Sequence, residues 1–335
     1  MANLKTIATG CDLCGSTESE LFAEGTDYEY QTTLETFRFV RCLRCSYVYL
    51  NPRPDEAELG TIYPSNYYSY VQRENRPGDG AISQLRARYF SGRLREVFAH
   101  LLSPGQTIRV LDVGCGDGRF LDLMKMCFGD DVETHGIDFD EDAVRAAAAN
   151  GHRTRVGRIE DTDYPSGHFD IVYISHVIEH LASPREFVLA ARELLREGGV
   201  LHIETPNIDC AERRLFGKTY WGGYHFPRHW HLFTPETLTK LGEETGFEVR
   251  SLAYATSPVF FNWSLHHVLW DNPATRSLSR MFGVTSIYRN NLWALARLLS
   301  FAVVERVLRL FSSGRGSNLV CQLVKPPANT RECTA

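Results

Sequence analysis

Short apolar stretches alternate with amphipathic ones through the middle of the chain. Five stretches rich in β-branched and aromatic residues predict strands: 109–113, 134–138, 154–161, 169–175 and 198–207. Between them, 140–151 and 183–199 have helical periodicity, and Ser183 with Pro184 is a typical helix start. Because strands that alternate with helices form a right-handed parallel sheet, we predict an α/β core over 106–255, with its ligand at the carboxyl ends of the strands.

The last third of the chain returns to this core after a long interruption. Segments 247–255 and 318–326 predict two final strands that pair antiparallel at the sheet edge, the second within a final strand and tail over 317–335. The residues between them, 256–316, are too many for a plain connection and predict a helical insertion. Its apolar helix, 291–311, has two interpretations: a lid or dimer helix packed on the core, or an interfacial helix that touches an anionic membrane.

The first 50 residues carry two CxxC pairs, in CDLCG and RCLRCS. Two such turns, brought together by a β-hairpin that includes 37–40, offer four thiolates to one tetrahedral ion. We therefore predict a zinc-ribbon module over 1–50 with a structural zinc on Cys11, Cys14, Cys42 and Cys45. A closed site of this kind leaves no position for catalysis. The alternative is two chance pairs of buried thiols.

Residues 51–105 predict a connecting region with capping helices. A short helical stretch at 55–62 is followed by the tyrosine-rich YPSNYYSY, a linker at 73–80 and an amphipathic helix at 81–102.

Composition narrows the class of protein. With 335 residues, 43% hydrophobic and 23% charged, the chain is typical of a globular protein with a large core. It has neither an apolar leader nor 18 consecutive uncharged apolar residues, so we expect a cytoplasmic protein. The net charge of −5 argues against a duplex nucleic-acid partner. The insertion differs, because it carries seven Arg, no Lys and two acidic residues.

RVLDVGCGDGRFL, at 109–121, is the most informative segment, since a strand runs into Gly114, Gly116 and Gly118. A dinucleotide fingerprint would need glycine at position 119, which is Arg. Asp112 followed by GxGxG is similar instead to the pattern of class I S-adenosylmethionine methyltransferases. Asp138 ends the second strand, where an acid would accept hydrogen bonds from ribose hydroxyls. The alternative is a Rossmann-like sheet that uses another nucleotide or none.

The chain resembles the zinc-ribbon class I S-adenosylmethionine-dependent methyltransferases of sugar, polysaccharide and secondary-metabolite biosynthesis. The resemblance rests on CDLCG…RCLRCSYVYLNPRP…YPSNYY, LDVGCGDGRFL, FDIVYISHVIEHLASP, TPN and FPRHWHLFTPETLTKLGEETGF. It implies a Rossmann-like mixed sheet in which the glycine loop holds the methionine end of the cofactor, an acid holds its ribose and two later residues flank its adenine. The implied cofactor-binding residues are Asp112, Gly114, Gly116, Gly118, Asp138, Phe139, Ile159, Glu160 and His176.

HVIEH, at 176–180, resembles the ExxEH metal motif of small-RNA 2′-O-methyltransferases and ubiquinone-pathway O-methyltransferases. The resemblance implies a second divalent metal on His176, Glu179, His180 and His231. A metal-free interpretation makes His180 or His229 the general base and lets Arg228 bind an anionic part of the substrate. In a third interpretation Glu179 caps the turn and the histidines are hydrogen-bonded in the core. The candidate catalytic residues are thus Glu179, His180, Arg228 and His229.

Together these features predict an enzyme that methylates a hydroxyl group of a sugar, glycan or related small metabolite. One alternative is C-methylation of a nucleotide-linked keto-deoxysugar. Another is RNA 2′-O-methylation, with the ribbon as an RNA-binding module, which the acidic net charge disfavours. A non-enzymatic interaction protein with a vestigial cofactor fold is disfavoured by the intact glycine loop. The sequence predicts neither the acceptor nor the oligomeric state.

Overall fold

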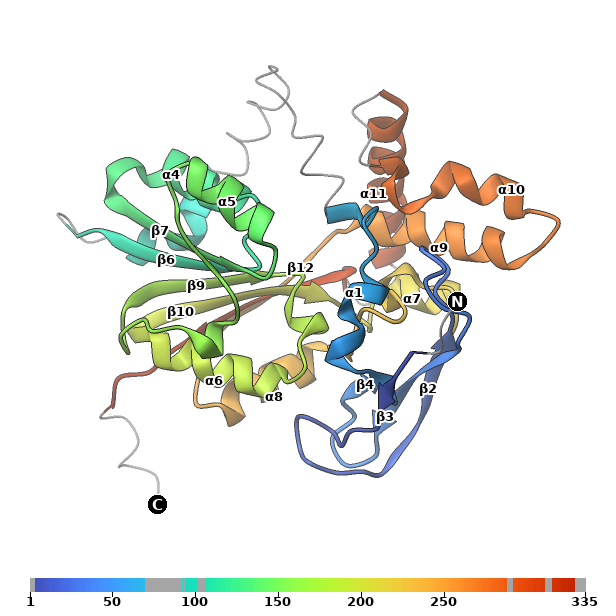
Figure 1. Ribbon diagram of the computed structural model, residues 1–335, viewed down its shortest axis with the longest axis horizontal. Helices are drawn as coiled ribbons and strands as arrows, with labels where there is room; N and C mark the ends of the chain where they lie inside the picture. Colours follow the sequence, from blue (N-terminus) through green and yellow to red (C-terminus); the bar gives the residue numbers. More distant parts are fainter. Residues whose placement is uncertain are drawn as a thin grey trace.

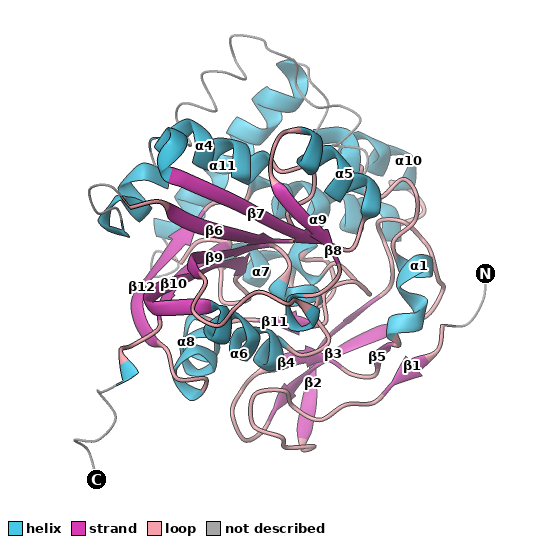
Figure 2. Ribbon diagram, turned by 60° about the vertical axis from the view of Figure 1, so that its left-hand side comes forward, coloured by secondary structure: helices cyan, strands magenta, loops and turns pink. Residues whose placement is uncertain are grey.

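The computed structural model describes residues 4–69, 92, 94–101, 106–287, 292–310 and 315–328. A central sheet of seven strands has the order β12-β13-β10-β9-β6-β7-β8 (Figures 1 and 2). The predicted linker at 73–80 and most of the predicted helix at 81–102 lie outside the described residues; 99–101 form a 3-10 turn, η2 (Ala99–Leu101).

Five strands form the parallel part of this sheet: β6 (Ile108–Val113), β7 (Val132–Asp138), β8 (Arg153–Val156), β9 (Phe169–Ser175) and β10 (Leu195–Pro206). β13 (Asn318–Val324) pairs antiparallel with both β10 and β12 (Glu248–Ala255). The predicted Rossmann-like mixed sheet is confirmed. Because the chain order reverses between β6 and β9, the loops after these two strands diverge and leave a ligand crevice at their carboxyl ends.

Helices cover both faces of the sheet (Figure 1). On one face lie α4 (Arg119–Phe128) and α5 (Glu141–Ala149), and on the other α6 (Pro184–Leu194) and α8 (Pro235–Glu244). Neighbouring residues of β9 alternate between the two cores: Ile171 packs with Phe98 and Met124, whereas Val172 packs with Phe187. Because these strands are buried on both faces, their sequences are continuous apolar runs.

The helix predicted over 183–199 is shorter than expected. Ser183 accepts the Glu186 amide hydrogen as the N-cap, but α6 ends at Leu194 and β10 begins at Leu195. Gly198 donates its amide hydrogen to the carbonyl of Lys325 at 2.8 Å, and Lys325 donates to the carbonyl of Gly199 at 3.0 Å, so both glycines pair with the end of the neighbouring strand β13. Non-local pairing therefore overrides the helical pattern of this segment.

The N-terminal module contains a four-stranded sheet with the order β11-β4-β3-β2. Three of its strands belong to the module itself: β2 (Ser19–Gly25), β3 (Phe37–Cys42) and β4 (Val48–Leu50). The fourth, β11 (His231–Leu232), belongs to the methyltransferase core and follows β10 in the chain. A small pair, β1 (Thr6–Ile7) with β5 (Arg53–Pro54), leads into η1 (Glu56–Glu58) and α1 (Leu59–Ile62). The module thus shares its sheet with the core rather than folding on a boundary at residue 50.

Short 3-10 turns connect the core elements: η3 (Gly129–Asp131), η4 (Ile159–Asp161), η5 (Ile178–His180) and η6 (Gly222–Tyr224). α7 (Ala211–Phe216) follows β10. The insertion is helical as expected, with α9 (Pro258–Asp271), α10 (Arg276–Ser279), η7 (Arg280–Phe282), η8 (Val284–Ile287) and α11 (Leu292–Leu310). Among the described residues, no helix is long and apolar enough to cross a membrane.

Candidate active site

The loop after β6 has a backbone conformation that requires glycine. Gly114, Gly116 and Gly118 have φ angles of 76°, 53° and 85°, a region that residues with a side chain rarely adopt. A Cβ atom on Gly114 would lie 2.4 Å from Cγ2 of Val177, whereas one on Gly116 would meet no atom within 4 Å. Gly114 is therefore needed for close packing against the loop after β9, and the backbone at Gly116 is open to a ligand.

Two acidic residues, Asp112 and Asp138, lie near the ends of β6 and β7 beside this loop. Asp138, at the end of β7, accepts the amide hydrogens of Gly116 at 2.8 Å and Asp140 at 3.0 Å. Asp112 is buried, and burial together with the charge of Asp138 raises the pKa of Asp112 well above its usual value. Asp138 thus fixes the shape of the loop. Its contact with the cofactor's ribose stays a prediction.

The remaining predicted cofactor-binding residues lie in the segments that follow β7, β8 and β9. Phe139 is 60% exposed and Ile159 is buried. Glu160, beside Ile159 in η4, is exposed. His176 follows β9 with a φ angle of 53°. The fold brings these segments to the same edge as the glycine loop, and their contacts with the cofactor stay predictions.

Glu179 is the buried centre of the second cluster. Its Oε1 lies 3.2 Å from His176 Nδ1, and its Oε2 accepts a hydrogen bond from Thr205 Oγ1 at 3.0 Å. Burial alone would raise the pKa of Glu179, but the hydrogen bond and charge of His176 outweigh it and lower the pKa overall. The Glu179 side chain is therefore a carboxylate at neutral pH.

His180 and His229 lie beside this carboxylate with their rings 4.6 Å apart. His180 Nδ1 lies 3.0 Å from the carbonyl oxygen of Arg228, and His229 Nδ1 lies 2.8 Å from that of Gly223. A carbonyl oxygen can only accept, so the His229 contact needs a proton on Nδ1 and leaves a lone pair on Nε2. Nδ1 of His180 also lies 2.8 Å from Tyr63 Oη, which can donate to it as well as accept from it. Burial lowers the pKa of His180 to about 4 and that of His229 well below its usual value, so both rings are neutral at pH 7.

Glu179, His180 and His229 form a group whose donor atoms all lie within 4.8 Å of one another. His229 Nε2 is 3.9 Å from Glu179 Oε1. A lone pair that faces a carboxylate in a buried site is unfavourable unless a cation or proton lies between them. Backbone carbonyls that hold the Nδ1 hydrogens are also the usual support of metal-binding histidines. The donor set therefore fits a divalent cation.

The predicted ligand set of this second site is wrong in two members. His231 belongs to β11, where it pairs with Tyr49, and its ring stacks on Tyr47 at 5.8 Å. It points into the N-terminal module rather than toward Glu179. His176 is outside the group as well and instead contacts the carboxylate through Nδ1. His229 takes the position that the sequence analysis gave to His231.

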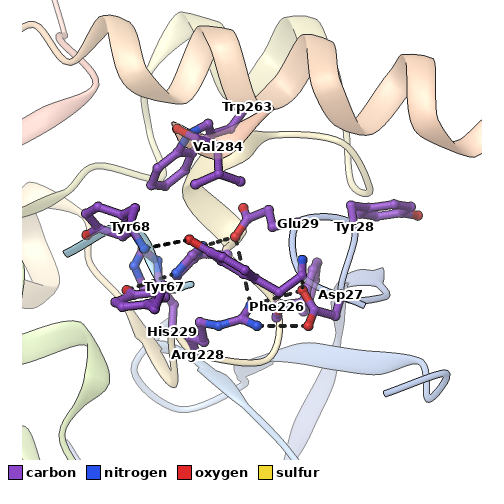
Figure 3. A network of polar contacts seen from close by, with 12 residues as sticks. Asp27, Tyr28, Glu29, Tyr67, Tyr68, Phe226, Arg228, His229, Trp263 and Val284 are labelled. Atoms are coloured by element: carbon purple, nitrogen blue, oxygen red, sulfur yellow. Dashed lines mark hydrogen bonds and ion pairs between the residues drawn. The ribbon is translucent and has the colours of Figure 1, made fainter. Parts of the chain in front are cut away.

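Arg228 does not face a substrate, so its predicted role is also wrong. The side chain is fully buried, and its two Nη atoms donate to the Asp27 carboxylate at 3.0 and 2.8 Å (Figure 3). Its Nε donates to the Ile62 carbonyl at 2.7 Å. Burial would lower the pKa of Arg228, but Asp27 outweighs burial and raises it. Through these contacts the guanidinium group joins the N-terminal module to the core.

The tyrosine-rich segment reaches the histidine cluster, which the sequence analysis did not predict. Tyr63 Oη lies 2.8 Å from His180 Nδ1, and Tyr67 Oη lies 3.2 Å from His225 Nε2. His225 Nδ1 in turn contacts the buried carboxylate of Glu29. The sequence held one signal for this contact: YPSNYYSY contains more tyrosines than an exposed connecting segment would need.

The four cysteines predicted to bind zinc lie together. All four Sγ atoms are within 4.8 Å of one another, with Cys11 to Cys45 at 3.4 Å and Cys14 to Cys42 at 3.5 Å. Sulfurs at the corners of a tetrahedral zinc site are about 3.8 Å apart, given a zinc–sulfur bond of about 2.3 Å. The cluster fits a small zinc-ribbon-like element.

The two cysteine turns have the same backbone design. Gly15 donates its amide hydrogen to the Cys11 carbonyl at 2.8 Å, and Ser46 donates to the Cys42 carbonyl at 2.9 Å. Gly15 and Ser46 both have positive φ angles, 74° and 63°. Each turn therefore presents its two thiols in the same way, as a shared tetrahedral site requires.

Comparison with known proteins identifies the class. The profile of the methyltransferase domain family matches residues 82–252, about half of the chain, so the protein belongs to this family. It is an S-adenosylmethionine-dependent methyltransferase, as the sequence analysis predicted. The match begins after the cysteine cluster, so the zinc ribbon rests on the cysteine geometry alone.

Relatives of two kinds are similar to the chain. A ubiquinone biosynthesis O-methyltransferase of Cereibacter sphaeroides is 29% identical over 195 residues, which are 54% of this chain and 78% of the relative. A probable S-adenosylmethionine-dependent methyltransferase of Mycolicibacterium smegmatis is 34% identical over 147 residues, 42% of this chain and 52% of the relative. Among solved structures, a SAM-dependent methyltransferase from Archaeoglobus fulgidus is 20% identical with a TM-score of 0.46, covering 77% of this chain and 100% of its own.

Proposed function

We propose that the protein transfers the methyl group of S-adenosylmethionine to a hydroxyl group of a small-molecule or glycan acceptor beside Glu179, His180 and His229. One observation carries the proposal: Val177 packs directly on Gly114, so the loop with the buried carboxylate and the cofactor loop are in contact. The O-methyltransferase names of relatives support a hydroxyl acceptor. The sugar or glycan nature of the acceptor rests on the resemblance of the cysteine module and its flanking motifs.

Methyl transfer to a hydroxyl forms an oxygen–carbon bond, breaks the carbon–sulfur bond and releases the hydroxyl proton. A general base works best with a pKa near the working pH. Burial holds the pKa of His180 at about 4 and that of His229 well below its usual value, so each ring by itself is a weak base. Both rings are therefore better suited to bind a metal ion as neutral ligands than to act as the general base.

Glu179, His180 and His229 are the residues that would hold a divalent cation. Two imidazoles and one carboxylate suit zinc, iron or manganese better than magnesium. When bound, such an ion lowers the pKa of a hydroxyl group in its vicinity. The chain itself orients the ligands: the carbonyls of Arg228 and Gly223 fix the two rings, and Thr205 fixes the carboxylate.

The cysteine cluster has a separate, structural role in this proposal. Four thiolates close a zinc site and leave no position for a substrate. The cluster packs with Tyr47 and Tyr49 against the face of the sheet that α6 and α8 cover. Zinc would stabilise the module that supplies Asp27 to Arg228 and thereby position the segment that carries His229.

The proposal is tested by incubating the protein with methyl-labelled S-adenosylmethionine and pooled hydroxyl acceptors, with sugars, glycans and phenols in separate pools. We expect label in a product with a new O-methyl group, identified by NMR. Label on carbon, or label only in added RNA, would contradict it. Cofactor binding measured in the same sample separates a wrong acceptor pool from a protein that does not bind the cofactor.

A further inference from the structure

α11 exposes an apolar stripe along its length. Trp293 is 84% exposed beside the stripe, and the stripe itself repeats every three or four residues. Its members are Leu292, Ala296, Leu299, Val303, Val307 and Leu310. Their exposed fractions reach 79% for Leu292, 60% for Leu299, 61% for Val303 and 82% for Leu310. Such spacing places these side chains on one side of a helix.

The helix is inverted relative to an ordinary surface helix, which turns its polar side to water. Its buried positions include Glu305, 3% exposed, whose Oε1 accepts hydrogen bonds from Ser317 N at 2.9 Å and Ser317 Oγ at 2.7 Å. Phe301 packs on Phe261 of α9 at 5.0 Å. The helix is therefore fixed to the protein partly through an acid, while much of its leucine and valine surface is exposed. An exposed stripe of this extent indicates a partner.

The charges around the stripe have one sign. Glu305 is the only acidic residue of α11, and it is buried; the other ionisable residues are Arg297, Arg306 and Arg309. Arg306 is exposed next to Val307. Arg297 donates to the carbonyl of Met281, whose own side chain is 62% exposed. A second copy of the chain would bring the same arginines together, so charge complementarity disfavours a dimer through this face.

We propose that α11 docks in the interface of a membrane that contains anionic lipids. Leucine, valine and tryptophan side chains enter the boundary between headgroups and acyl chains, and Arg306 beside them binds a lipid phosphate. The proposed contact is peripheral, with α11 lying in the plane of the interface. The proposal concerns docking and is independent of the acceptor.

The test is co-sedimentation of the full chain with vesicles of phosphatidylcholine, with and without phosphatidylglycerol. We expect binding only when phosphatidylglycerol is present, and weaker binding as salt is raised. The double variant Leu299→Glu, Val303→Glu should lose about tenfold or more in affinity. Leu34→Glu is the matched control, because Leu34 is 78% exposed in the N-terminal module. Its binding should match that of the wild type.

Three outcomes would overturn the proposal. The first is a wild type that sediments with neither kind of vesicle. The second is a Leu34→Glu control that loses as much binding as the double variant. The third is a dimer, detected by light scattering, that the double variant separates, since this result assigns the stripe to a second copy. If the double variant lowers the melting temperature, Arg306→Gln decides instead, since removal of one exposed charge should weaken binding roughly fivefold without unfolding the helix.

Discussion

The Asp27 carboxylate and the Arg228 guanidinium form a bidentate ion pair from which water is excluded. The two residues are 201 positions apart in the sequence. Arg228 lies next to His229, and its carbonyl oxygen holds the ring of His180. The ion pair therefore connects the N-terminal module to both histidines of the candidate site.

Asp27→Asn should destabilise the protein strongly. The change leaves the buried Arg228 charge without its bidentate partner and with Glu29, at 3.9 Å, as the remaining carboxylate. Loss of one partner of a buried pair costs about 3–5 kcal/mol. Chemical denaturation gives the free energy of unfolding. The matched control is Glu24→Gln, because Glu24 pairs with Arg38 on the surface with 50% and 62% of the side chains exposed. That pair should contribute less than about 1 kcal/mol. Equal losses in the two variants would contradict the role of the buried pair.

The same pair predicts a loss of stability in acid. Burial would raise the pKa of Asp27, but the charge and hydrogen bonds of Arg228 outweigh it and lower the pKa overall. A group with a depressed folded pKa contributes stability above its unfolded pKa of about 3.9, and this contribution falls as pH drops through the folded value. Wild-type stability should therefore fall more steeply than that of Asp27→Asn below about pH 4. Parallel pH profiles would argue against the assignment.

Gly116→Val should abolish binding of S-adenosylmethionine while the protein stays folded. The glycine has a φ angle of 53° and open space at its Cβ position. Gly217→Val is the matched control, because Gly217 has a φ angle of 71° and is equally open, but follows α7. Both substitutions place a β-branched residue at a positive φ angle, so both should cost stability, which thermal melting measures. Calorimetry should detect cofactor binding only in the control, and normal affinity of Gly116→Val would refute the assignment.

Cys42→Ser should release the structural zinc. We expect about one zinc per chain at the cysteine cluster, and its loss should destabilise the N-terminal module because binding is coupled to folding. Cys127→Ser, a change of a buried cysteine in α4, should keep the ion. Metal analysis and thermal melting check both points. A wild-type protein purified without chelator that holds no zinc at these cysteines would contradict the prediction.

The sequence predicted the sheet and the glycine loop because their signals are local. Each buried strand is a continuous apolar run, and Gly114, Gly116 and Gly118 occur together at a strand end. The pairing of Asp27 with Arg228 has no local signal. A charged residue gives no sign of burial when its partner lies 201 residues away.

The choice between His229 and His231 also depends on non-local structure. Both residues lie in the same short segment, and the resemblance favoured His231 because Leu232 and Phe233 follow it. Pairing of His231 with Tyr49 draws that residue into the sheet of the N-terminal module. A two-residue strand has no periodicity from which its pairing could be predicted.

The ligand assignment at Glu179 is the central claim, and metal content tests it most directly. Protein reconstituted with zinc should hold about two ions per chain, one at the cysteines and one at Glu179, His180 and His229. His229→Ala should hold about one ion and lose methyl transfer, whereas His231→Ala should hold about two and stay active. Two ions and full activity in His229→Ala, or loss of the second ion in His231→Ala alone, would contradict the account.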